Sequence, residues 1–298
     1  MKSRLMLPLI LLASLLLASP RSLADPPVTF EVVATFDYSG VSQTSPTGIN
    51  DRGDVAGYFL NQAIDLFGFV RFADGHFSGP IIDPNDTQGL TFVSGINNQG
   101  TLCGSYIVGA SYFSFLVSGS NFTDLTVVDS DTDVKGLNDA GNFCGNSYNP
   151  PSAFVSIGGT VSSVVVPGAV STNMNDINNL NECVGTYQIA DRGFGFRRAA
   201  DGALTYPILA PGAEFTILRG VNDKGRMVGS VLKDYVYQAV YFPSPGAFAI
   251  YDYPGAVETD FTGINNRNLI CGSYVMPSES GGLVTRGIIV RAKTATSD

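Results

Sequence analysis

The sequence GINDRGDVAGYF, residues 48–59, decides the fold, because five further copies of it follow. The copies are GINNQGTLCGSY (95–106), GLNDAGNFCGNSY (136–148), DINNLNECVGTY (176–187), GVNDKGRMVGSV (220–231) and GINNRNLICGSY (263–274). Their starts lie 47, 41, 40, 44 and 43 residues apart. This period is typical of a four-stranded propeller blade rather than of helical repeats, which recur at about 33 to 34 residues. The sequence therefore predicts a repeat protein.

Each copy is predicted to form a tight β-hairpin. An asparagine stands at the first turn position in all six copies, where its side-chain oxygen can accept a hydrogen bond from a backbone N–H ahead of it. Three residues later, four copies have a glycine for the left-handed conformation, and Asn181 and Asn268 are the best non-glycine substitutes in the other two. A glycine inside every second strand predicts close approach of a neighbouring backbone. These strand glycines are Gly57, Gly104, Gly145, Gly185, Gly229 and Gly272.

Two further strands follow each hairpin, such as 67–72 and 76–83 in the first repeat, but only 286–291 remains after the last hairpin. The stretch from Thr29 to Tyr38 has the pattern of the missing strand. We therefore predict an all-β, six-bladed β-propeller with four-stranded blades, in which the N-terminal strand completes the C-terminal blade. A β-sandwich or an open solenoid of the same hairpins would share this period and stays an alternative.

The pattern resembles a bacterial extracellular repeat family named for its His-Ala-Phe (HAF) motif, whose units carry a G-I-N-x-x-G-x-x-x-G hairpin followed by an HAF strand. The hairpin matches well along essentially the whole chain after residue 24, whereas the second motif is degenerate and lacks its histidine throughout. Its counterparts are Phe67-Gly68-Phe69, Phe113-Ser114-Phe115, Ser152-Ala153-Phe154, Phe194-Gly195-Phe196, Gln238-Ala239-Val240 and Arg286-Gly287-Ile288. The resemblance implies export and a repetitive β fold, and it carries no general catalytic assignment.

Residues 1–24 are predicted to be a secretory signal peptide, because Lys2 and Arg4 precede an apolar run that is followed by small residues. The run is too short for a comfortable membrane span. We expect residues 25–298 to be one exported, monomeric domain, extracellular or periplasmic. Without the leader, 14 basic residues face 26 acidic ones, a net charge of about −12. This charge disfavours nucleic acid and anionic membranes as partners.

The sequence has few of the residues that form disulfides, metal sites or catalytic nucleophiles. Cys103, Cys144, Cys183 and Cys271 stand in second strands of different repeats, so we predict buried free thiols rather than disulfides. The single histidine, His76, flanks a turn and is predicted to lie at the surface. No nucleophile elbow, zinc spacing or phosphate-binding loop occurs, so we predict no metal and no cofactor.

The acidic stretch DSDTD leaves two interpretations open. Asp129, Asp131 and Asp133 alternate and could collect a calcium ion, or they form a solvated acidic loop. The EF-hand pattern fails, because Val134 and Ala140 stand where that loop needs glycine and glutamate.

Two other residue types recur at fixed places. A threonine lies four residues before every motif, and its presence in all repeats predicts a scaffold role, with the hydroxyl satisfying a buried backbone group. A tyrosine follows the strand glycine in five repeats and could either stack on a sugar ring or cover the blade end. These residues are Thr44, Thr91, Thr132, Thr172, Thr216 and Thr259, and Tyr58, Tyr106, Tyr148, Tyr187 and Tyr274.

The candidate site rests on where the repeats differ. The position directly before the motif is occupied by Thr47, Ser94, Lys135, Asn175, Arg219 and Thr262. We predict that Lys135, Asn175 and Arg219 bind an anionic group such as a uronate carboxylate. The adjoining ligand-binding residues are predicted to be Tyr148, Tyr187, Asp191, Arg192 and Tyr235. The alternative is that each cation is paired with a nearby carboxylate, such as Asp133 or Glu214.

These patterns favour a non-catalytic propeller that binds a partner through one face. The expected partner is an extracellular glycan, an anionic small molecule or a protein. The alternative is a propeller enzyme, a lyase or glycoside hydrolase that acts on an extracellular polysaccharide or a related substrate. A structural platform at the envelope is a third interpretation.

Overall fold

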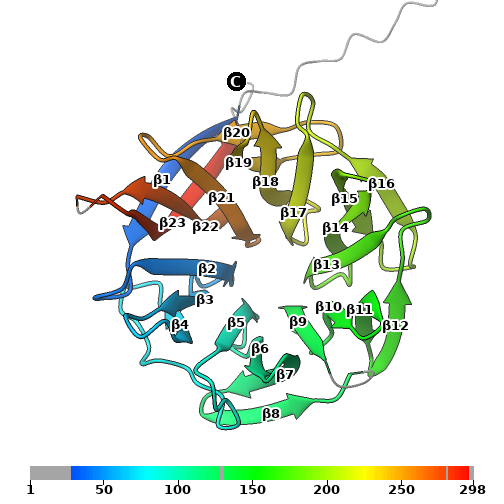
Figure 1. The fold of residues 1–298 in the computed structure, drawn as a ribbon. Helices are drawn as coiled ribbons and strands as arrows, with labels where there is room; N and C mark the ends of the chain where they lie inside the picture. Colours follow the sequence, from blue (N-terminus) through cyan, green and yellow to red (C-terminus); the bar gives the residue numbers. More distant parts are fainter. Residues whose placement is uncertain (1–27, 128–130, 280, 295–298) are drawn as a thin grey trace, which may run out of the picture.

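A computed structural model describes residues 28–127, 131–279 and 281–294. The chain in these ranges folds into β-strands without a helix, arranged around a central axis as in a β-propeller (Figure 1). The signal peptide predicted at residues 1–24 lies outside the described residues, as does Asp129. No helix in the described ranges has the length and apolar character needed to cross a bilayer.

All six predicted hairpins are present, each with an inner strand beside the axis and a second strand outside it (Figure 1). The inner strands are β2 (Gln43–Ile49), β5 (Thr91–Ile96), β9 (Thr132–Leu137), β13 (Ser171–Ile177), β17 (Phe215–Val221) and β21 (Glu258–Ile264). The second strands are β3 (Val55–Leu60), β6 (Leu102–Val108), β10 (Phe143–Tyr148), β14 (Cys183–Ile189), β18 (Met227–Lys233) and β22 (Leu269–Pro277).

Third and outer strands follow in the same order. The third strands are β4 (Leu66–Arg71), β7 (Ser111–Ser118), β11 (Pro151–Ile157), β15 (Arg192–Arg198), β19 (Val236–Phe242) and β23 (Leu283–Thr294). The outer strands are β8 (Asn121–Leu125), β12 (Thr160–Val164), β16 (Leu204–Ile208), β20 (Ala249–Tyr251) and β1 (Val28–Phe36). In the first repeat, the bridges Gly68↔Ile81 and Arg71↔Phe77 occupy the outer position.

The strands pair antiparallel within each repeat. β5 to β8 form one four-stranded sheet and β9 to β12 another, whereas the remaining strands form sheets of seven and eight. Each larger sheet contains a parallel junction of one residue pair, Gln43↔Thr285 or Gly193↔Phe215. β1 pairs with β23 along its length, so the two ends of the described chain lie side by side, as predicted (Figure 1).

The strand glycines are packed against the phenylalanines of the degenerate second motif. A Cβ on Gly57 would lie 2.3 Å from the backbone oxygen of Ser45 and 2.9 Å from the ring of Phe69. Gly57 and Phe69 are cross-strand partners, as are Gly104 and Phe115 in the second repeat. The predicted close approach of a backbone is therefore confirmed, and the space above the glycine is filled by the phenylalanine ring.

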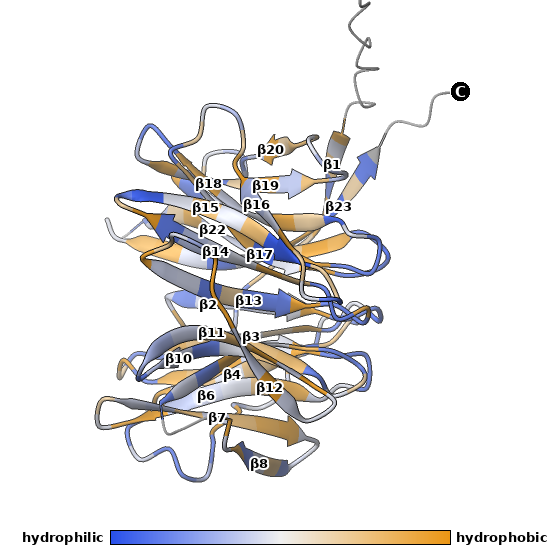
Figure 2. Cartoon of the chain, turned by 90° about the vertical axis from the view of Figure 1, so that its right-hand side faces the viewer, coloured by the Kyte–Doolittle hydropathy of each residue, from blue (hydrophilic) through white to orange (hydrophobic). Residues whose placement is uncertain are grey.

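The core lies between neighbouring sheets, and hydrophobic segments run along the strands while many loops are hydrophilic (Figure 2). The third-strand rings of Phe69, Phe115, Phe154 and Phe196 are buried there. All four cysteines are buried free thiols, as predicted. Burial raises the pKa of the Cys271 thiol to about 12, which keeps it in the unreactive protonated form.

The threonines of the inner strands have the predicted scaffold role. All six are buried. The hydroxyl oxygen of Thr44 accepts the backbone N–H of Tyr38 at 2.9 Å, and Thr172, Thr216 and Thr259 accept equivalent N–H groups at 2.9–3.1 Å. Each of these four threonines thereby fastens the segment that leads into its inner strand.

Candidate ligand-binding site on the axis

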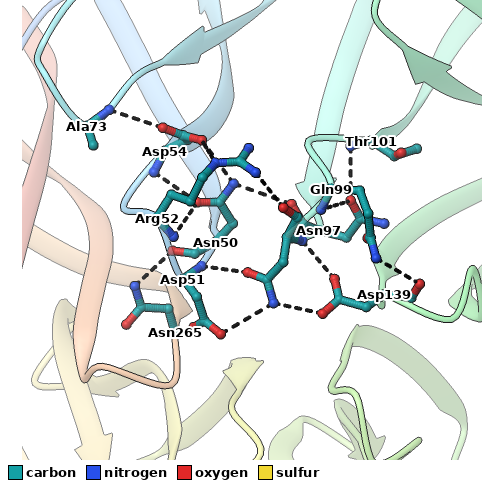
Figure 3. A network of polar contacts seen from close by, with 11 residues as sticks. Asn50, Asp51, Arg52, Asp54, Ala73, Asn97, Gln99, Thr101, Asp139 and Asn265 are labelled. Carbon is teal, nitrogen blue, oxygen red and sulfur yellow. Dashed lines mark hydrogen bonds and ion pairs between the residues drawn. The ribbon is translucent and has the colours of Figure 1, made fainter.

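The six turn asparagines form a closed ring of hydrogen bonds at one end of the axis. The side-chain oxygen of Asn50 accepts the backbone N–H groups of Arg52 and Asp54, each at 3.0 Å, as predicted (Figure 3). The amide of each asparagine donates to the backbone oxygen of the next asparagine over 2.8–3.3 Å. The order is Asn50, Asn97, Asn138, Asn178, Asn222, Asn265 and back to Asn50.

A second ring is formed by the next residue of each turn. These residues alternate in type: Asp51, Asn98, Asp139, Asn179, Asp223 and Asn266. The backbone N–H of each donates to the side-chain oxygen of its neighbour over 2.7–2.9 Å. The amide of Asn98 also donates to Asp51 at 3.3 Å and to Asp139 at 2.8 Å. Alternation suits the ring because an amide between two carboxylates donates to both and separates their charges.

At the other end of the axis, every inner strand has a β-bulge at the residue directly before the motif. The pairing of β2 with β3 skips from Pro46 to Gly48, and the other five inner strands skip the equivalent residue. A bulge leaves one residue unpaired and re-aims its side chain. The bulged residues are Thr47, Ser94, Lys135, Asn175, Arg219 and Thr262, which is the polar position found in the sequence.

All six bulged side chains line one cavity of about 410 Å³. Ser45, Ser105 and Ser273 line the same space, together with Tyr58 and Phe92. The two rings meet edge to face with centroids 5.4 Å apart. The volume falls within the range of small-molecule sites, about 300–1,000 Å³. Hydroxyl groups beside aromatic faces suit a polar ligand that contains a ring.

Lys135 forms an ion pair with Asp133, two residues earlier on β9. The Asp133 side chain is buried and also accepts hydrogen bonds from Ser105 Oγ at 2.9 Å and from the Tyr148 hydroxyl at 3.4 Å. Burial, with the Asp133 charge beside it, raises the pKa of Tyr148. This cation is therefore held by a carboxylate that has several partners of its own.

Arg219 forms the second ion pair, with its Nε 2.8 Å from Asp260 Oδ2 on the neighbouring inner strand. Burial raises the pKa of Asp260, and the adjacent guanidinium opposes that rise. Arg219 Nε is buried and forms no hydrogen bond with any described residue, so its contact with Asp260 is an ion pair alone, whereas 37% of the Arg219 side chain is exposed. The exposure therefore lies elsewhere on the side chain, and Asp260 orients a guanidinium whose remaining nitrogens can reach the cavity.

Two of the four uncharged bulged residues tie neighbouring inner strands together. Thr47 Oγ1 donates to the backbone oxygen of Val93 at 2.9 Å, and Asn175 Nδ2 donates to that of Leu218 at 2.7 Å. Both acceptors belong to the next inner strand around the axis. Lys135 and Arg219 do not make this contact in the described part of the chain, and their longer side chains extend to carboxylates at the cavity wall instead.

Four of the eight residues predicted to bind ligand line the cavity: Lys135, Asn175, Arg219 and Tyr148. The other four do not. Tyr187 is buried in the core and stacks on Phe194, with centroids 5.4 Å apart. Asp191 and Tyr235 lie at exposed turns after β14 and β18, and Arg192 is the exposed first residue of β15. The alternative of ion pairing occurs for both cations, although Arg219 pairs with Asp260 rather than Glu214.

The location of each tyrosine depends on whether it stands an odd or an even number of residues after the strand glycine. Tyr58 and Tyr148 stand one and three residues after the strand glycine and line the cavity. Tyr106, Tyr187 and Tyr274 stand two residues after it and are buried in the core. Since side chains alternate between the two faces of a strand, counting this offset identifies the cavity-facing tyrosines. Treating all five as equivalent was wrong.

Sequence reasoning missed Asp260, and it considered Asp133 as a calcium ligand or as an ion-pair partner but not as part of the cavity wall. Both occupy the position two residues before the bulge, where β2 has Ser45 and β5 has Phe92. The six repeats share no residue type at this position, which holds Ser45, Phe92, Asp133, Asn173, Ile217 and Asp260, so departure from the other repeats would not have singled out the two carboxylates.

The other candidate groups lie elsewhere. His76 is exposed, with Nδ1 2.5 Å from Asp74 Oδ1, and belongs to an outer turn. Asp131 accepts the backbone N–H of Tyr112 at 2.9 Å, and Asp133 is paired with Lys135, so these two acids make protein contacts. No cluster of three metal-ligating side chains occurs within residues 28–127, 131–279 and 281–294.

No family model and no curated protein matches the chain. Among solved structures, a protein of unknown function from Dyadobacter fermentans has a TM-score of 0.54 and 10% identity, covering 89% of this chain and 99% of its own. A mutant of AofleA from Arthrobotrys oligospora has a TM-score of 0.53 and 12% identity, with 91% of each chain covered. Virginiamycin B lyase from Staphylococcus aureus has a TM-score of 0.48 and 11% identity, covering 87% and 88%. At sequence identities this low, a structural similarity concerns the fold alone.

Proposed function

We propose that residues 25–298 form an exported, six-bladed β-propeller that binds a small hydroxylated anion in its axial cavity without transforming it. The ring of six turn asparagines supports the blade count, because one hydrogen bond per repeat returns to Asn50. The junctions Gln43↔Thr285 and Gly193↔Phe215 are single residue pairs, too limited to merge adjacent blades. The sheets of seven and eight strands then count as two blades each.

Export and membership of the HAF repeat family are parts of the same proposal. The sequence of residues 1–24 supports export. The six GIN hairpins support the family, as does the burial of Phe69, Phe115, Phe154 and Phe196 at the last position of the degenerate motif.

The orientation of Arg219 carries the ligand assignment. Its Nε side faces Asp260, so the free side of a planar, five-donor guanidinium is available to a carboxylate, which it can bind bidentately. Across the axis from β17 lies β5, which supplies Phe92 (Figure 1). A sugar acid fits this arrangement, since its carboxylate can reach Arg219 while the ring lies toward Phe92 and Tyr58. Serine and threonine hydroxyls around the wall can bond its hydroxyl groups.

A binding role fits better than lyase or hydrolase chemistry. A catalytic tyrosine base needs a lowered pKa, whereas burial raises that of Tyr148. Asp133 is fully engaged by Lys135, Ser105 and Tyr148, which leaves it poorly placed to transfer a proton. The single histidine lies on an outer turn.

Titration calorimetry with D-galacturonate, its methyl ester and D-galactose tests this function. We expect the acid to bind more tightly than the uncharged ester by about tenfold, the scale of one charge-assisted hydrogen-bonded pair. Arg219→Thr, which installs the residue type of Thr47 and Thr262, should remove this preference while the free energy of unfolding changes by no more than about 1 kcal/mol. Equal affinity for all three sugars, or no binding of any, would contradict the proposal.

A further inference from the structure

Asp176 stands at an inner-strand position that is glycine in the other repeats. The motif begins with glycine in the other five repeats, at Gly48, Gly95, Gly136, Gly220 and Gly263. Around the axis these backbones nearly touch, since a Cβ on Gly48 would lie 3.3 Å from the Cα of Gly95. Only the fourth repeat places a side chain in this layer, and that side chain is a carboxylic acid.

The Asp176 carboxyl is held at the axis by two backbone groups. Its Oδ1 accepts the N–H of Ile177 at 2.8 Å, and its Oδ2 accepts the N–H of Val221 at 2.9 Å on the neighbouring inner strand. It therefore bridges β13 and β17, and β17 also carries Arg219.

The carboxyl lies directly beneath the proposed ligand cavity. A small axial space of about 80 Å³ runs from the bulged residues toward the asparagine ring, and Asp176 lines it. Lys135, Asn175 and Arg219 line both this space and the larger cavity. A space of this size accommodates a few water molecules and excludes a sugar. The carboxyl thus faces the inner end of the site without being available as a direct ligand contact.

We propose that Asp176 makes anion binding in the cavity proton-dependent, because its ionised carboxylate repels an anion held above it and its protonated form does not. The proposal rests on the proposed function. Burial, against the two backbone hydrogen bonds, raises the pKa of Asp176 to about 7. An anion at Arg219 disfavours the carboxylate further, so binding takes up a proton near neutral pH.

Other groups around Asp176 also carry or acquire charge. Asp223, on the turn after β17, acts to raise the Asp176 pKa, and Asp260 faces Arg219 with a raised pKa of its own. The remaining charged groups that line the axial space are Lys135, Arg219, Asp51 and Asp139, and the thiols near it are Cys103, Cys144 and Cys271. Only variants at position 176 separate its contribution from theirs.

The variant Asp176→Gly restores the residue that the other five repeats have, so the backbone already tolerates it. Asp176→Asn keeps the shape of the side chain but carries no charge. It serves as a second test in case glycine enlarges the axial space. D-galacturonate stays ionised from about pH 5.5 to about pH 8.5, since ordinary carboxyl pKa values lie near 4. D-galactose is the uncharged control.

The experiment is calorimetric titration of the wild type and both variants across this pH range. In the wild type we expect D-galacturonate to bind about fivefold more weakly at the upper limit than at the lower one, the scale of two charges about 10 Å apart at an effective dielectric constant of about 35. Both variants should lose most of this dependence, and D-galactose should show none. Titration in two buffers of different ionisation enthalpy should reveal proton uptake in the wild type alone.

Two adverse outcomes are distinguishable. The same pH profile in the wild type and in both variants would overturn the role of Asp176 and leave the proposed function standing. No binding of D-galacturonate by any of the three proteins at any pH would overturn the proposed function and, with it, this proposal.

Discussion

The two ends of the axis are built from the same six hairpins, but their polar residues follow different patterns. At the turn end, six asparagines repeat one contact around the circle, and the neighbouring Asp and Asn residues alternate so that each is bonded to the next. At the cavity end, the bulged residues differ from repeat to repeat, and two of them are cations that extend to carboxylates. Positions that hold the same residue in all repeats therefore serve the fold, whereas the bulged positions, whose residues differ between repeats, form the candidate site.

Removing β1 tests whether both ends depend on closure of the ring. β1 covers the edge of β23, and the Phe30 ring packs 5.1 Å from Tyr251 and 5.8 Å from Phe261. A chain without Val28–Phe36 should lose cooperative unfolding and form oligomers, because an exposed edge strand recruits further strands. Size-exclusion chromatography with urea unfolding measures this. A truncated monomer with an unchanged midpoint would show that closure is dispensable.

Asn222→Ala should damage the turn end and so have the largest effect among the single substitutions. The buried side chain accepts the N–H groups of Lys224 and Arg226 and donates to the Asn265 backbone oxygen. Loss of these bonds should lower the free energy of unfolding by about 3 kcal/mol, since buried backbone donors are left without partners. Urea denaturation measures the change. A loss below about 1 kcal/mol would mean that the ring contributes little.

The turns also allow a graded test at Asn268, whose φ of +60° matches the left-handed conformation predicted for it. Replacement by valine should cost about 1 to 2 kcal/mol, because a β-branched residue resists this conformation. Replacement by glycine, which stands here in four repeats, should be neutral or slightly stabilising. Thermal unfolding of the two variants in parallel gives the comparison. Equal stabilities would mean that the backbone relaxes to another conformation.

At the cavity end, Arg219→Thr should change stability least. The side chain is 37% exposed and its ion pair is partly open to solvent, so the expected change is within about 1 kcal/mol. Urea unfolding checks this against Asn222→Ala. A larger loss would mean that Arg219 serves the fold as well as the site.

Much of the scaffold follows from the sequence because each of its devices is local. The turn asparagines, the left-handed Asn181 and Asn268, and the close-packed Gly57 each depend on a few neighbouring residues, and repetition over six copies separates these devices from chance. The pairing of β1 with β23 was also predictable, since one strand was missing at one end and one was in excess at the other.

The candidate site was only half predictable, for two physical reasons. The bulge in each inner strand shifts the alternation of side chains by one residue, and no residue type marks it in the sequence. Contacts between neighbouring inner strands, such as that between Arg219 and Asp260, join residues from different repeats that are about 40 positions apart in the chain. Tyr187 shows the complementary error, since its offset of two from the strand glycine places it in the core.

The most direct measurement determines stability and ligand affinity together in two variants, one from each end of the axis. Asn222→Ala should lower the free energy of unfolding by about 3 kcal/mol and leave the affinity of the folded protein for D-galacturonate within about twofold of wild type. The double variant Lys135→Ser with Arg219→Thr should still fold, because it installs residue types found in the other repeats, and it should abolish the preference for D-galacturonate over D-galactose. Undiminished preference in the folded double variant would contradict the assignment of the site to the positions where the repeats differ.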